Sequence, residues 1–119
     1  MKKILIVDDS KLVNTIHESI LKKAGFIVTC AENGVDGLEK SKLDKFDLIV
    51  TDLNMPKMGG FELTKQLRSD FDYKMTPIIM VSTEKETTDI EQGKSMGITD
   101  YIVKPVVAND LVDKVKKYL

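Results

Sequence analysis

The chain has 119 residues, a formal net charge of −1, and ordinary shares of apolar (42%) and charged (31%) residues. This length suits one globular domain with a sizeable core, so we expect a single domain over residues 1–119. Lysine and arginine are spread along the chain, which excludes a basic patch that could follow a nucleic-acid backbone. We therefore expect no direct DNA binding.

The sequence has no stretch typical of a targeting or membrane-spanning segment. The first apolar run, residues 4–7, ends at two acids and is too short for a signal peptide or a transmembrane helix. The single cysteine, Cys30, lies in an apolar stretch and has no partner for an internal disulfide, so we expect a buried thiol in a reducing compartment. These features predict a cytoplasmic protein that makes no membrane contact.

Five short apolar runs alternate with amphipathic stretches along the chain. The runs predict strands at residues 4–7, 27–30, 47–51, 77–81 and 100–103. Apolar residues at helical spacing predict helices at residues 11–24, 35–43, 61–68 and 85–96, and a last helix that carries Leu111, Val112, Val115 and Leu119. Continuous apolar strands alternating with helices are typical of a parallel sheet covered on both faces. We therefore predict an α/β fold with a doubly wound, five-stranded (βα)5 sheet.

The first predicted helix combines an apolar stripe with the only histidine of the chain. The stripe, which we expect to be buried, consists of Leu12, Val13, Ile16, Ile20 and Leu21. No second histidine or cysteine lies near His17 in the sequence, so a metal site there is not expected. We expect His17 on the solvated face of the helix.

Polar groups follow every predicted strand except the second. They are carboxylates after the first and third strands, a hydroxyl after the fourth and an ammonium after the fifth: Asp8, Asp9, Asp52, Ser82 and Lys104. Taken singly, such an aspartate is as readily a helix cap and such a serine a turn residue. Ligands of an open parallel sheet bind outside the carboxyl ends of its strands. The joint placement therefore favours one shared site.

Three carboxylates in one small site repel each other unless a cation neutralises them. Mg²⁺ suits this site, because it takes one or two protein carboxylates and shares its other positions with water and phosphate oxygens. Asp8 and Asp9 would hold the ion and Asp52 would share it. Asp52 could then accept a phosphoryl group by direct attack, while Lys104 and Ser82 contact two of its oxygens.

These residues resemble the receiver domain of two-component response regulators, in particular the single-domain chemotaxis type. The resemblance rests on four segments that stand in the same order, ILIVDDS at 4–10, TDLNMPKMGG at 51–60, MVSTE at 80–84 and DYIVKP at 100–105. It implies the flavodoxin-like strand order 2-1-3-4-5. It also implies that residues 1–119 form one receiver domain without an output domain.

The resemblance implies a role for each residue of the site. Asp52 is then the phosphoacceptor, and Lys104 is the lysine that binds the phosphoryl group. Mg²⁺ is then bound by Asp8, Asp9, Asp52 and the backbone carbonyl of Asn54. The bond between Lys104 and the following proline is similar to one that is cis in this family.

Further positions match residues that, in this family, take part in the conformational switch and in hydrolysis of the aspartyl phosphate. Ser82 is the switch hydroxyl by this resemblance, and Thr83 lies one position too late for that role. Tyr101 matches the switch aromatic, whose ring moves inward when the hydroxyl is drawn toward the phosphoryl group. Asn54 and Glu84 occupy the two positions that tune hydrolysis of the aspartyl phosphate.

Our leading hypothesis is a phosphorylation-activated signalling switch. A sensor histidine kinase would phosphorylate Asp52, and the face made by the fourth helix, fifth strand and fifth helix would change its affinity for an output protein. Such a domain catalyses only its own phosphotransfer and autodephosphorylation, so we do not expect an enzyme that acts on other substrates.

The output protein could be the flagellar motor switch, but the contact surface is only partly kept. Where the chemotaxis regulator has basic residues and an aromatic, this chain has Glu86, Thr87 and Val106. Lys114 in the last helix agrees with motor binding.

Two further hypotheses stay open, a phosphate relay or sink and a protein-interaction module that works without phosphorylation. An electron carrier or a phosphatase fits less well. Asp8 and Asp9 would repel a flavin phosphate, and Asn54 stands where a phosphatase has its second acid.

Overall fold

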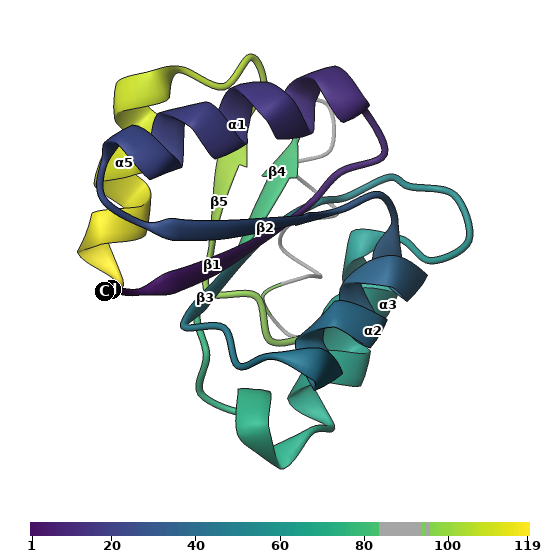
Figure 1. Ribbon diagram of the computed structural model, residues 1–119. Helices are drawn as coiled ribbons and strands as arrows, with labels where there is room; N and C mark the ends of the chain where they lie inside the picture. Colours follow the sequence, from purple (N-terminus) through teal and green to yellow (C-terminus); the bar gives the residue numbers. More distant parts are fainter. Residues whose placement is uncertain (84–93, 95) are drawn as a thin grey trace.

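Five parallel strands form a single sheet with helices on both faces in the computed structural model of the chain (Figure 1). The structure describes residues 1–83, 94 and 96–119. The strand order is β2-β1-β3-β4-β5, which confirms the predicted doubly wound topology. The predicted fourth helix, residues 85–96, falls almost entirely outside the described residues. No helix in the described part of the chain is long and apolar enough to cross a membrane.

The predicted strands and helices agree with the structure to within one residue at most of their ends. The strands are β1 (Lys3–Val7), β2 (Ile27–Ala31), β3 (Leu48–Asp52), β4 (Ile78–Ser82) and β5 (Asp100–Val103). The described helices are α1 (Lys11–Lys23), α2 (Gly34–Leu43), α3 (Gly60–Arg68), the short 3-10 helix η1 (Phe71–Tyr73) and α5 (Ala108–Lys117). The third and fourth strands each lie one residue later than predicted. Asp52 and Ser82 are therefore the last residues of their strands, and not the first residues after them.

Alternate residues of the strands supply the two larger hydrophobic cores among the described residues, because successive side chains point to opposite faces of a sheet. One core joins Ile4, Ile6 and Val50 to Leu21 of α1 and Leu111 of α5. The other joins Leu5, Val7 and Ile49 to Leu63 and Leu67 of α3. The sheet is thus a middle layer, with α1 and α5 on one face and α2 and α3 on the other.

The buried face of α1 differs from the predicted stripe. Leu12 and Ile16 are 70% and 48% exposed, whereas Asn14 and His17 are each only 7% exposed. The prediction for His17 was therefore wrong. The reason is that the Asn14 side chain bonds the ends of two strands. Its Nδ2 donates to the carbonyls of Asp8 (2.9 Å) and Ala31 (3.1 Å). This turns the polar residues at positions 14 and 17 inward and leaves two apolar residues in solvent.

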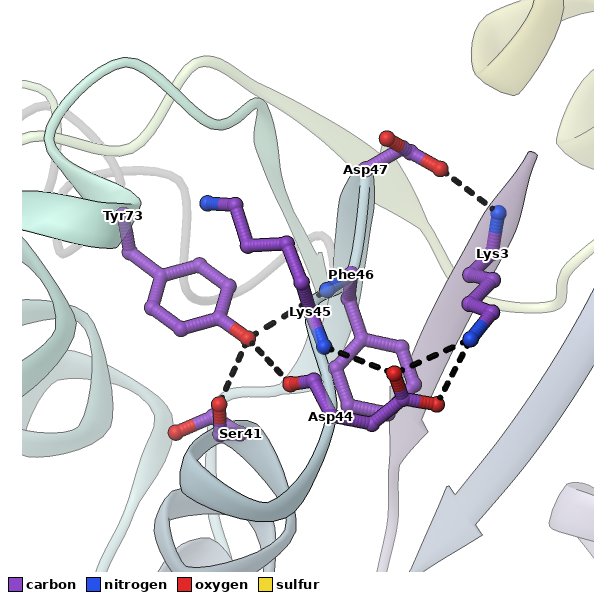
Figure 2. Close-up of polar contacts among 7 residues, drawn as sticks. All are labelled: Lys3, Ser41, Asp44, Lys45, Phe46, Asp47 and Tyr73. Carbon is purple, nitrogen blue, oxygen red and sulfur yellow. Dashed lines mark hydrogen bonds and ion pairs between the residues drawn. The ribbon is translucent and has the colours of Figure 1, made fainter.

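Tyr73 of η1 fastens the loop before β4 to the loop before β3 (Figure 2). Its side chain is 1% exposed, and its hydroxyl donates to the carbonyl of Ser41 at 2.7 Å, with the carbonyl of Asp44 also in reach at 2.9 Å. The same hydroxyl accepts a hydrogen bond from the Phe46 amide at 3.3 Å. The Lys45 ammonium lies 4.1 Å from the centre of the ring. One buried phenol thus bonds backbone groups at the end of α2 and in the loop that follows it.

The Arg68 side chain connects the loop before β4 to the loop before β5. Its guanidinium donates to the carbonyls of Tyr73 and Thr76, both at 2.7 Å, and to the carbonyl of Gly97 at 2.9 Å. Gly97 has a φ of +109°, and a β-carbon there would lie 2.9 Å from Arg68 Cγ. The position therefore suits only glycine, for conformational and steric reasons.

Removing the Tyr73 hydroxyl should destabilise the fold. Tyr73→Phe leaves a buried amide, a buried carbonyl and a partly buried carbonyl without this partner, so we expect the free energy of unfolding to fall by about 1–3 kcal/mol in urea titrations. Tyr118→Phe is the control, because its hydroxyl bonds Asp100 near the surface, where water can replace it. Equal effects of the two substitutions would contradict this account of Tyr73.

Candidate functional site

The polar groups predicted at the strand ends do meet at the carboxyl edge of the sheet. Carboxylate oxygens of Asp8, Asp9 and Asp52 all lie within 4.8 Å of one another. The Lys104 ammonium, from the loop after β5, is 2.9 Å from Asp52 Oδ1. Three separate segments of the chain thus bring three carboxylates and one ammonium to the ends of β1, β3 and β5.

Burial sets the electrostatics of these acids. Asp8 and Asp52 are 4% and 6% exposed, whereas Asp9 is exposed. Removal from water raises the pKa of Asp52, and this outweighs the opposing effect of the Lys104 hydrogen bond; the nearby Asp8 raises it further. Burial likewise raises the pKa of Asp8, against the hydrogen bond from the Ser10 amide. The site therefore holds more negative charge than its one lysine relieves.

Backbone amides fix the direction of the two buried carboxylates. The Ser10 amide donates to Asp8 Oδ1 at 2.8 Å, and the Leu53 amide donates to Asp52 Oδ1 at 3.0 Å. Ser10 is also the N-cap of α1, where its hydroxyl accepts from the Val13 amide at 3.2 Å. The start of α1 thus orients Asp8 through the same residue that caps the helix.

Close backbone packing supports Asp52 from below. The amide of Gly60 donates to the carbonyl of Leu53 at 2.8 Å, and a β-carbon at position 60 would lie 2.4 Å from the carbonyl of Asp52. A β-carbon at Gly34 would likewise lie 2.4 Å from the carbonyl of Met58. Glycine at these two positions lets the loop after β3 fold tightly behind the carboxylate.

The two hydroxyls after the apolar run of β4 have different surroundings. Ser82 is fully buried, and its Oγ has no hydrogen-bond partner among the described residues. Thr83 is exposed. Tyr101, on the neighbouring strand β5, packs against the cluster of Leu53, Met80 and Ile98. Burial thus separates Ser82 from Thr83, and the switch role of Ser82 stays a prediction.

Comparison with known proteins decides the family. The family model described as "Response regulator receiver domain" matches residues 4–116. The chain belongs to the response regulator receiver domains.

Relatives of this receiver domain match it from end to end. It is 38% identical to protein PilH of Pseudomonas aeruginosa over 119 residues, which is 100% of this chain and 98% of PilH. The structure of chemotaxis response regulator CheY4 of Vibrio cholerae superposes with a TM-score of 0.95 at 38% identity, covering 100% of this chain and 99% of that one. The receiver domain of sensor histidine kinase PA1611 from P. aeruginosa, with a magnesium ion in its active site cleft, gives a TM-score of 0.90 at 25% identity, covering 98% and 96%.

The acid cluster of this receiver domain fits a hard divalent cation. Its donors are carboxylate oxygens, which Mg²⁺ prefers, and the raised pKa values of Asp8 and Asp52 show negative charge that a cation would relieve. Asn54 is exposed at the start of the loop after β3, where its backbone carbonyl stays our prediction for a further ligand. Glu84, the second residue predicted to tune hydrolysis, lies outside the described residues.

Asn14 is a residue of the site region that sequence reasoning missed. Its side chain joins the carbonyls of Asp8 and Ala31, at the ends of β1 and β2. The sequence signal was a polar residue inside the apolar stripe of the first helix. Such a residue indicates either a solvated turn of helix or a buried hydrogen bond, and periodicity does not separate the two.

Neutralising Asp8 should stabilise the metal-free domain. A carboxyl whose pKa is raised on folding does not reduce the stability of the fold at a pH below its ordinary pKa of 3.8. It destabilises the fold as the pH rises from there through the raised pKa of the folded state. We therefore expect Asp8→Asn to unfold at higher urea concentration than wild type at pH 7 with chelator. The advantage should shrink as the pH falls toward 4.

The exposed Asp44 supplies a control of opposite sign. Hydrogen bonds from Lys3 lower the pKa of Asp44, so Asp44→Asn should not stabilise the domain at pH 7. Added Mg²⁺ should stabilise wild type more than Asp8→Asn, by about 1.4 kcal/mol for wild type at ten times its dissociation constant. An Asp8→Asn protein that is less stable than wild type in chelator would contradict the account of strain among the acids.

Proposed function

We propose that this receiver domain is a phosphorylation-activated signalling switch that accepts a phosphoryl group from a sensor histidine kinase on Asp52. The observation that carries this proposal is the buried Asp52 carboxylate, paired at 2.9 Å with Lys104 inside a cluster of three acids. A carboxylate so placed can act as a nucleophile toward phosphorus. Phosphoryl transfer needs little else from a protein than positioning and relief of charge.

Each side chain of the site has a separate task in this mechanism. Asp8, Asp9 and Asp52, with the Asn54 carbonyl, would hold Mg²⁺, which neutralises charge on the phosphoryl oxygens when it is bound. The Leu53 amide holds Asp52 Oδ1, so the carboxylate is presented in one orientation. Lys104 is paired with Asp52 before phosphorylation. Its ammonium, on a long flexible side chain, could then pair with a phosphoryl oxygen instead.

The unpartnered Ser82 hydroxyl supports a switching role. A buried hydroxyl without a hydrogen bond costs free energy, and a phosphoryl oxygen on the neighbouring strand would supply the missing acceptor. Asp52 and Val81 are opposite each other in the β3–β4 ladder, so Ser82 is one residue from that register. Movement of Ser82 toward the phosphoryl group would vacate space beside Met80, into which the Tyr101 ring could turn.

The output surface that we propose includes β5 and α5 together with residues 85–96, which the sequence predicts as a fourth helix and which lie almost entirely outside the described residues. Lys114 of α5 is already paired there, its Nζ lying 3.3 Å from Asp100 Oδ2. Val106 is half buried against the core shared with α1 and α5. Binding to the flagellar motor switch stays a prediction, and Glu86 and Thr87 lie outside the described residues. A relay or sink would use the same phosphoryl chemistry without this surface.

We propose no reaction on external substrates beyond phosphotransfer to Asp52 and its hydrolysis. Action in the cytoplasm stays a prediction from the sequence.

A small phosphodonor tests the proposal directly. After incubation with acetyl phosphate and Mg²⁺, we expect intact-mass spectrometry to show one adduct of about 80 Da on the wild-type protein. The adduct should be absent with chelator and absent in Asp52→Asn, which removes the nucleophile but keeps the shape of the side chain. Asp36→Asn, a partly buried acid of α2, is the matched control and should still form the adduct. An adduct on Asp52→Asn would place the chemistry elsewhere.

Substitution of Lys104 should affect the activated state but not the binding of Mg²⁺. Removing its ammonium in Lys104→Ala leaves the three acids in place, so Mg²⁺ affinity, followed by tyrosine fluorescence or calorimetry, should not fall. The activated state should be lost, because nothing then follows the charge from Asp52 to the phosphoryl oxygen. NMR shifts of Tyr101 on adding beryllofluoride report that state, and shifts equal to those of wild type would contradict the role of Lys104.

A further inference from the structure

The buried histidine of α1 shares a cavity with the lysine of the phosphorylation site. This cavity has a volume of about 270 Å³ and is mainly apolar. It is lined by Val13, Ile16 and His17 of α1 and by Lys104, Pro105 and Val106 of the loop after β5. His17 is 7% exposed there, so its imidazole is a wall of the cavity and not a surface group.

Lys104 reaches from this cavity to the phosphorylation site. Its side chain is 38% exposed, and its ammonium lies 2.9 Å from Asp52 Oδ1. His17 and Lys104 are the two titratable side chains among the described residues that line the cavity. A charge on the buried imidazole would therefore act on the lysine, with water at the exposed side chains of Ile16, Lys104 and Pro105 screening part of the interaction.

The charges around His17 favour a neutral imidazole. Burial lowers the pKa of His17, and the positive charge of Lys104 lowers it further. Asp8, at the end of β1, belongs to the acid cluster with Asp9 and Asp52. Burial raises the pKa of the Cys30 thiol on β2, so this thiol stays neutral. The α5 helix packs Leu111 and Val115 inward and adds no side chain to the cavity lining. At pH 7 the lysine thus faces an uncharged ring.

We propose that His17 is a positioning residue for Lys104, whose protonation state sets how readily the lysine leaves Asp52 for a phosphoryl oxygen. The inference rests on the proposed phosphorylation of Asp52 and adds a coupled proton site to it. When Asp52 is phosphorylated, the site gains negative charge, and the Lys104 ammonium would be more fully neutralised by a phosphoryl oxygen. Both changes favour the imidazolium, so phosphorylation and protonation of His17 assist each other by thermodynamic linkage.

The first experiment measures the pairing of His17 with Lys104 in the unphosphorylated protein. Because His17 is the only histidine, its imidazole ¹⁵N and ¹H signals can be titrated by NMR without assignment of others. We expect a midpoint below 6.5 in wild type and a higher midpoint in Lys104→Gln. Lys40→Gln, which removes an ammonium held by Asp36 and the Cys30 carbonyl, should leave the midpoint unchanged. An unchanged midpoint in Lys104→Gln would overturn the proposal.

The second experiment needs no change at Lys104. In the presence of Mg²⁺ and beryllofluoride, a phosphoryl mimic, the His17 midpoint of wild type should rise. By linkage, the affinity of wild type for beryllofluoride should increase as the pH falls through the window between the two midpoints, by up to about tenfold for each pH unit that separates them. His17→Gln keeps a polar side chain without a titrating proton, so it should lack this added pH dependence.

These two experiments separate failure of the inference from failure of the proposed function. Beryllofluoride that binds normally, with a His17 midpoint that stays in place and a His17→Gln pH profile equal to that of wild type, would overturn the role of His17 alone. Beryllofluoride that fails to bind in the presence of Mg²⁺ would overturn the proposed phosphorylation and, with it, the linkage to His17.

Discussion

Two buried carboxylates and a third, exposed one repel each other at the carboxyl edge of this receiver domain, and the burial of the first two raises the free-energy cost of their charge. A parallel sheet makes that repulsion hard to avoid, since all strands end at the same edge and deliver whatever follows them to one place. Asp8 and Asp52 are nearly buried, and one lysine stands against them. The edge is therefore built to attract positive charge and, once charge is balanced, to tolerate an incoming phosphoryl group.

The rest of the fold keeps this unfavourable arrangement rigid. Asn14 connects the ends of β1 and β2, Ser10 both caps α1 and orients Asp8, and Gly60 lets the loop after β3 press against Asp52. The two larger hydrophobic cores, one on each face of the sheet, stabilise the fold and offset the unfavourable free energy of the buried carboxylates. Function and packing thus divide by position along each strand, with apolar residues in the body and polar groups at the end.

The fold and the meeting of the site residues could be predicted from the sequence because both depend on short-range patterns. Apolar runs such as residues 78–81 give a strand, and the order of strands and helices leaves a parallel sheet as the simple outcome. The inward face of α1 could be predicted only in part. Leu21 is buried as hydrophobic spacing predicts, but Leu12 and Ile16 are exposed, and Asn14 and His17 are buried in their place. Nor does the sequence show the burial that distinguishes Ser82 from Thr83, which depends on packing between strands. Cys30, predicted to be buried, is only half buried because β2 is an edge strand.

Arg68 couples the local unfolding of β4 to that of β5. Its guanidinium holds carbonyls that precede β4 and the carbonyl of Gly97 that precedes β5. Opening either loop breaks bonds to the same charged group, so we expect the backbone amides at the starts of β4 and β5 to exchange their protons together. The strand that carries Ser82 and the strand that carries Tyr101 are therefore anchored at the same point, at the edge of the sheet farthest from the phosphorylation site.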